Sequence, residues 1–147
     1  MLRKSTSEKG QSLVEVALVV PVLIILFLGI AEVGFLLFAH VQVTNAAREG
    51  ARYGSLCRLN HNCFGAGFTL TDIVESAVMS EAQPLKMNGS NTNVNVQPAS
   101  MSVVPDMGSP ITVTVTYTHT PPFISNFVPM FPSHIPVQHR VIMHFDK

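Results

Sequence analysis

The sequence is poor in charge and in cysteine. Charged residues make up 12% of its 147 positions, and the formal net charge is zero. A nucleic-acid-binding surface needs clustered basic residues, so this class is excluded. The chain has two cysteines, no low-complexity tail and no repeat of fixed period. Its length leaves room for one modest domain beside any membrane segment.

Catalytic motifs are missing as well. The sequence has no Gly-x-Ser-x-Gly, no phosphate-binding glycine-rich loop, no His-Glu-x-x-His and no spaced metal cluster. The histidines are scattered along the chain, and His119 and His139 fall in phase with the apolar faces of predicted strands, at the sheet edge. The sequence therefore predicts no enzyme activity, no cofactor and no metal site.

In contrast, one hydrophobic run is long. Val16 to Ala39 contains a single charge, Glu32. About 20 apolar residues cross a bilayer, and the apolar core of a cleaved signal peptide is shorter than this run. Arg3, Lys4 and Lys9 precede it. Because positive flanks stay in the cytoplasm, we expect a retained single-pass anchor with everything after Ala39 outside.

The anchor is expected to continue as a helix beyond the membrane. No proline interrupts the alanine-rich stretch after Ala39, and a helix over 12–54 would end at a capping Gly54. Pro21 and Gly29 are expected to bend or loosen it. Ala46, Gly50 and Gly54 recur at four-residue spacing, which permits close backbone approach. They would pack either against the chain's own domain or against neighbouring subunits.

Cys57 and Cys63 follow the helix, with His61 between them. Because an extracytoplasmic compartment is oxidising, the main interpretation is a local disulfide. Free thiols remain an alternative. A zinc site is a third, although three ligands in one loop match no structural zinc pattern.

The sequence after the two cysteines predicts a short helix and three strands. A helix over 72–82 is indicated by a capping box of Asp72 and Glu75. The segments 94–104, 111–118 and 137–145 predict strands. The first is weaker and broken near Pro98, whereas 111–118 alternates without exception. The fold class is therefore α+β, with a long helix packed on a small three-stranded antiparallel sheet. The proline- and phenylalanine-rich segment 120–136 would cover the sheet or offer an apolar contact surface.

Three N-terminal segments resemble one known family. Gly10-Gln11-Ser12-Leu13-Val14-Glu15 before an apolar run with Pro21 is similar to the class III signal of type IV pilins. Together with Gly29-Ile30-Ala31-Glu32 and the stretch 44–53, it resembles the TadE-like family. The resemblance covers about residues 9 to 54. Val16 stands where most relatives carry an aromatic residue.

The resemblance implies a minor pseudopilin of a bacterial Tad adhesive pilus. A prepilin peptidase would cut after Gly10, so that Gln11 becomes the N-terminus and Glu15 the assembly carboxylate. Residues 1–10 would be a cytoplasmic leader, 11–39 the transmembrane helix and 40–147 a periplasmic domain. The implied partners are the peptidase, other Tad pilins and pseudopilins, the inner-membrane assembly platform and membrane lipid.

A carboxylate in the membrane gives this inference a physical reason. Ionisable groups are costly in hydrocarbon unless they find a partner. The ammonium created on Gln11 would neutralise Glu15 of the same or an adjacent subunit, and Glu32 is a second candidate for pairing. Glu15 could instead lie in the cytoplasmic headgroup zone and have no function there. The alternative function is a permanently anchored periplasmic module that binds a partner.

Overall fold

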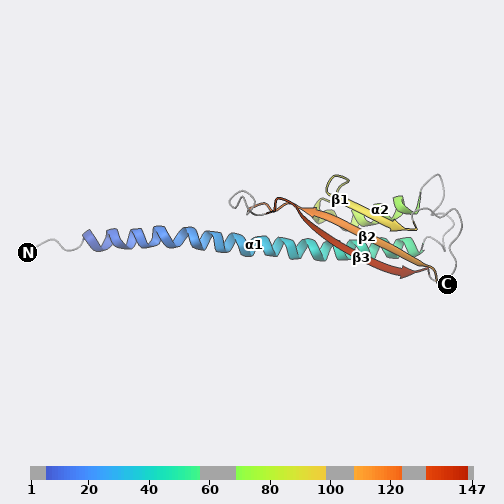
Figure 1. Cartoon of the computed structure of the whole chain (residues 1–147), viewed down its shortest axis with the longest axis horizontal. Helices are drawn as coiled ribbons and strands as arrows, with labels where there is room; N and C mark the ends of the chain where they lie inside the picture. Colours follow the sequence, from blue (N-terminus) through green and yellow to red (C-terminus); the bar gives the residue numbers. More distant parts are fainter. Residues whose placement is uncertain (1–5, 57–68, 99–107, 124–131, 146–147) are drawn as a thin grey trace, which may run out of the picture.

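The computed structural model describes residues 6–56, 69–98, 108–123 and 132–145. The chain forms a long helix, a short helix and a three-stranded antiparallel sheet (Figure 1), so the predicted α+β class is confirmed. Cys57 and Cys63 lie outside the described residues, and the predicted disulfide with them. In chain order the elements are α1 (Thr6–Leu56), α2 (Leu70–Glu81), the 3-10 helix η2 (Gln83–Leu85), β1 (Thr92–Gln97), β2 (Pro110–His119) and β3 (Ile135–His144).

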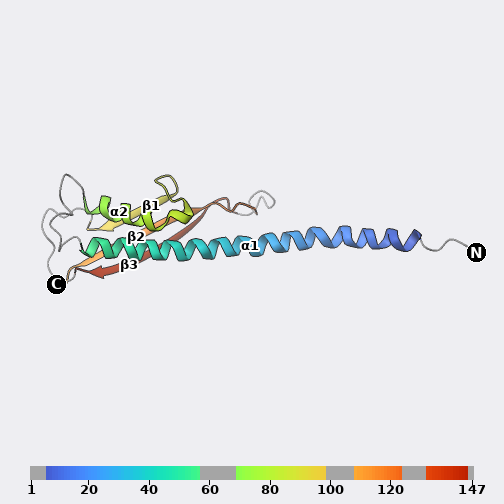
Figure 2. The same cartoon turned by 180° about the vertical axis from the view of Figure 1, so that it is seen from behind.

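Helix α1 has two halves with different surroundings. It contains 51 residues, which makes it roughly 75 Å long. Figures 1 and 2 show its N-terminal half projecting away from all other elements. We call residues 10–31 the bare segment, because none of them is buried. Residues 32–56 are the covered segment, and with α2, η2 and the sheet they form the domain.

The end of α1 differs from the prediction. The helix does not stop at Gly54 but runs to Leu56, and Pro21 lies inside it without ending it. Gly54 serves packing and not capping. A Cβ atom at Gly54 would lie 2.5 Å from Ile111 Cδ1, closer than side chains tolerate. The Ile111 side chain would have to shift to admit a Cβ atom there, so Gly54 lies in close contact with a side chain of β2.

The sheet has the order β1-β2-β3, and both pairs are antiparallel. As the alternation predicted, one face of β2 is buried: Ile111, Val113, Val115 and Tyr117. Cross-strand partners share a face, so Val96 joins Val113, and His139 joins Val115, on this inner side. β1 stops before Pro98, where a break was predicted, because proline has no N–H for the ladder.

The core lies between the inner face of the sheet, α2 and the covered segment. Small residues of α1 let these three layers approach closely. The fully buried side chains include Ala39, Val43, Ala46, Ala47, Ala51, Leu70, Val74, Val78, Ile111, Val113 and Val115.

The N-terminal cap of α2 corrects a second prediction. Thr69, and not Asp72, is the cap residue, and its hydroxyl accepts a hydrogen bond from the Asp72 N–H at 3.2 Å. The Asp72 carboxylate accepts the Thr69 N–H at 2.7 Å in return. The capping box therefore starts three residues before the predicted one. The Thr69 hydroxyl and then its N–H, both donating to Asp72, lower the pKa of that carboxyl group.

Candidate functional site

The bare segment is an apolar surface on all sides. Leu13 is 72% exposed, Leu18 70% and Phe27 65%. The most apolar 18-residue window of α1 has a mean hydropathy of 2.9, and none of it is buried. Exposed apolar area on this scale is not stable in water. By length and composition, α1 is able to anchor the chain in a membrane with a single pass.

Three residues of the predicted processing and assembly site lie on the first turns of the described helix. Gly10 and Gln11 are inside α1, so the bond between them lies in helical backbone. Glu15 is exposed on the bare segment. Residues four positions apart lie on the same helix face, one turn from each other. An α-amino group on Gln11 would therefore stand one turn from the Glu15 carboxylate.

Glu32 has different surroundings, although it belongs to the same helix. It is 1% exposed, and its Oε1 atom lies 3.4 Å from His119 Nε2 at the end of β2. Its Oε2 atom accepts a hydrogen bond of 3.3 Å from the backbone N–H of Phe123. The chain's own domain thus surrounds this carboxylate. His119 and Phe123 are neighbours of Glu32 that the sequence analysis did not identify.

The contact between Glu32 and His119 lacks hydrogen-bond geometry. Both atoms are within ion-pair distance, yet neither Glu32 Oε1 nor His119 Nε2 has a hydrogen-bond partner among the described residues. Buried polar atoms without partners are costly. Between His119 and Phe123 in the chain, Pro121 is fully buried, and the Phe123 ring lies 6.2 Å from that of Phe35.

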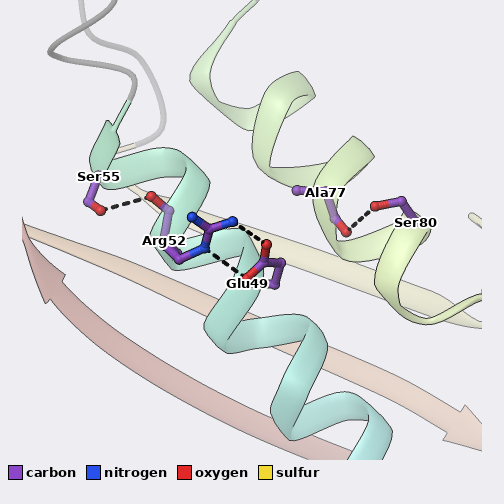
Figure 3. A network of polar contacts seen from close by, with 5 residues as sticks. All are labelled: Glu49, Arg52, Ser55, Ala77 and Ser80. Carbon is purple, nitrogen blue, oxygen red and sulfur yellow. Dashed lines mark hydrogen bonds and ion pairs between the residues drawn. The ribbon is translucent and has the colours of Figure 1, made fainter.

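The small-residue face of α1 points into the domain. A Cβ atom at Gly50 would lie 2.6 Å from Val78 Cγ2 and 3.2 Å from Val74 Cγ1, both on α2. Ala46 is fully buried, and Gly54 faces β2 and α2. Figure 3 shows α1 and α2 side by side at this level. Of the two packing alternatives, this arrangement is contact with the chain's own domain.

Beside this contact, the exposed face of α1 carries an ion pair. Arg52 donates to Glu49 at 2.6 and 2.9 Å (Figure 3), and its guanidinium lies 4.9 Å from the Tyr53 ring centre. The hydrogen bond from Arg52 lowers the pKa of Glu49. Exposed pairs of this kind contribute little to stability because water competes for both charges. The pair is a solvated feature of the surface.

A groove of about 410 Å³ lies between the start of the covered segment and the start of β3. Val33, Leu37 and His40 form its α1 side, and the start of β3 forms the other. The His40 ring lies 6.2 Å from that of His139, which belongs to the inner face of the sheet. In the ranges that the structure describes, no three potential ligands cluster in a way that could hold a metal ion.

Comparison with known proteins gives one match. The family model described as TadE-like protein matches residues 10–52, which include the bare segment and most of the covered segment. The family resemblance seen in the sequence is therefore confirmed over these residues and relates the chain to Tad pilus proteins. No curated protein and no solved structure matches the chain.

Proposed function

From the TadE-like match over residues 10–52, we propose that the chain is a non-enzymatic, membrane-anchored minor pseudopilin that takes part in assembling a Tad-type adhesive pilus. Residues 1–10 are the cytoplasmic leader, 11–39 the membrane helix and 40–147 the part of the chain that lies beyond the bacterial inner membrane. A prepilin peptidase removes the leader by cutting between Gly10 and Gln11. Other Tad pilins and the inner-membrane assembly platform are its partners.

The exposed position of Glu15 is the observation that carries this proposal. The bare segment holds one acid, Glu15, which is exposed and lies one turn from Gln11. Glu32 is enclosed by His119 and the Phe123 amide, so it is not accessible to another subunit in this structure. Glu15 is therefore the carboxylate of α1 that a neighbouring subunit can reach within the membrane.

Cleavage changes the energetics of this acid. A carboxylate in hydrocarbon costs a few kcal/mol, and a nearby ammonium recovers part of that cost. The Gln11 ammonium, created by the peptidase, supplies the partner at one helical turn. Pairing across two subunits fixes the axial register of their helices. Removal of the basic leader also releases the segment that holds the N-terminus in the cytoplasm.

N-terminal processing is the first test. In cells that contain the peptidase, mass analysis of the purified chain should show loss of residues 1–10 and a new N-terminus at Gln11. The Gly10→Ala variant should keep its leader, because the peptidase is expected to require glycine before the cut. A chain that retains Met1 in such cells would instead support the alternative, a permanently anchored module that binds a partner.

The two acids of α1 provide a matched pair for the second test. Glu15→Ala should abolish piliation, counted by electron microscopy, while the thermal unfolding of the domain stays unchanged, because Glu15 contacts no part of the domain. Glu32→Ala should lower the unfolding temperature, because it leaves a cavity at a buried position and removes the acceptor of the Phe123 N–H. Normal piliation in the Glu15 variant would refute the assembly role.

A further inference from the structure

Exposed apolar side chains lie on both flanks of α1 at the level of Glu32. On one flank, Phe35 and Phe123 lie with their rings 6.2 Å apart, and Phe123 remains 37% exposed. On the other flank, Val33 and Leu37 line the groove together with the start of β3. Figure 1 shows the end of β2 and the start of β3 beside the middle of α1. We call this part of the domain, residues 32–38, 119–123 and 135–137, its near end.

The near end lies at the level where the bilayer should stop. A hydrocarbon core of about 30 Å corresponds to roughly 20 helical residues. Counted from Gln11, the far boundary falls at Ile30; counted from Val16, it falls at Phe35. The headgroup layer adds roughly 5–7 Å, or about four residues. Residues 32–38 therefore lie at the boundary or in the headgroups, not in open water.

This position accounts for the enclosure of Glu32. A carboxylate at the hydrocarbon boundary would face lipid on the exposed side of an isolated helix, which is unfavourable. Here His119 and the backbone N–H of Phe123 stand on the side to which Glu32 points. His119 is buried against Glu32, while Phe35, Phe38 and Phe123 remain exposed. This is the reverse of the arrangement expected for a surface in water.

We propose that the near end is seated in the lipid of the leaflet on the domain's side. Phe35, Phe38 and Phe123 contact lipid there, and the groove beside Val33 and Leu37 is filled by acyl chains. The domain then does not stand off the membrane on a free helix. The inference rests on the proposed membrane anchoring and goes beyond it. Anchoring alone does not determine how deeply the domain sits in the bilayer.

Lipid is the occupant that the observations favour. The exposed apolar band is continuous with the bare segment, which lipid must cover if α1 spans the membrane. The band also lies on both flanks of α1, as expected for a surface met by a fluid and not by one docked partner. Because α1 tethers the domain, the near end stays close to the membrane surface. Its effective concentration there is high, so even weak apolar contacts with lipid form.

The chain contains no tryptophan, so single tryptophans can report depth. We suggest Phe123→Trp at the near end and Phe27→Trp in the bare segment, both in the full-length chain reconstituted in phosphatidylcholine vesicles. Tyr53→Trp is the matched aromatic control, because Tyr53 is exposed near the far end of α1. Ile135→Trp reports on the opposite flank. Bromine on the acyl chains, placed near the headgroup or near the methyl end, quenches fluorescence by contact.

The expected pattern distinguishes the two levels. Tryptophan at 123 should lose most fluorescence to bromine near the headgroup, and its emission should shift to the blue. Tryptophan at 27 should respond most to bromine near the methyl end, because it lies about 16 Å beyond Val16. Tryptophan at 135 should behave like 123, and tryptophan at 53 should be unquenched by either lipid.

Two other outcomes have separate meanings. If tryptophan 27 is quenched while 123 and 135 respond to neither lipid, the anchoring stands and the seated near end is refuted. Such a result would indicate that a protein partner, and not lipid, covers the exposed phenylalanines of the near end. If tryptophan 27 is not quenched either, the proposed membrane helix itself fails, and the inference fails with it.

Discussion

The bare and covered segments belong to one continuous helix, yet their side chains are suited to different surroundings. In the bare segment, large apolar side chains such as Leu18 and Phe27 point outward in every direction. In the covered segment, one stripe of small residues, including Ala46 and Gly50, receives α2 and the sheet. The first pattern fits a lipid solvent and the second a protein neighbour.

The two carboxylates follow the same division. Glu15 is exposed in the bare segment, whereas Glu32, at the start of the covered segment, is enclosed by His119 and Phe123. Identical side chains therefore lie in different environments, which are set by what packs beside them. Paired substitutions in the two segments should therefore differ sharply in their effect on the stability of the domain.

The largest difference is expected for isoleucine. Ile111→Ala should lower the free energy of unfolding by about 3–4 kcal/mol, because Ile111 is fully buried and its loss leaves a cavity. Ile25→Ala removes the same atoms from the bare segment, where Ile25 is 64% exposed, and should leave domain stability unchanged. Thermal melts of the full chain in detergent, followed by circular dichroism, measure both. Equal losses would contradict the division.

Glycine provides the next comparison. Gly50→Leu should destabilise the domain by about 2–3 kcal/mol, because even its Cβ would overlap Val78, a stiff β-branched side chain in the core. At Gly29 a Cβ meets nothing within 4 Å, so Gly29→Leu should not affect the melt. The same measurement applies. A mild effect at Gly50 would show that α2 can move away from α1.

The smallest effect concerns the cap of α2. Thr69→Ala should lower stability by about 1 kcal/mol, because the Asp72 N–H loses its acceptor. Asp72→Asn should also destabilise at neutral pH. Since folding lowers the pKa of Asp72, its contribution is present at neutral pH and is lost as pH falls through the folded pKa, below about 4.

The pH dependence distinguishes the carboxylate from a general loss of packing. The gap in melting temperature between the wild type and Asp72→Asn should narrow on acidification below about pH 4. Thr69→Ala serves as the control for the neutral partner of the box. A gap that stays constant down to low pH would mean that the Asp72 charge has no part in the cap.

Much of the fold was predictable because it depends on local periodicity. The alternation in 111–118 placed Ile111, Val113 and Tyr117 on the buried face, and the structure confirms it. Prediction failed at element ends. The capping box at Thr69 was missed because the pair of Asp72 and Glu75 has the same spacing, and local sequence does not decide between two such pairs.

The sequence by itself determined a helix of membrane length, a strand pattern, a family match and the position of Glu15 one turn from Gln11. Each of these follows from residue order along one element. Only the tertiary structure decided that Glu32 meets His119 and Phe123, which are about 90 residues away. It also decided that Gly50 and Gly54 face α2 and β2. Contacts between distant segments depend on how whole faces pack, and no short-range pattern encodes that.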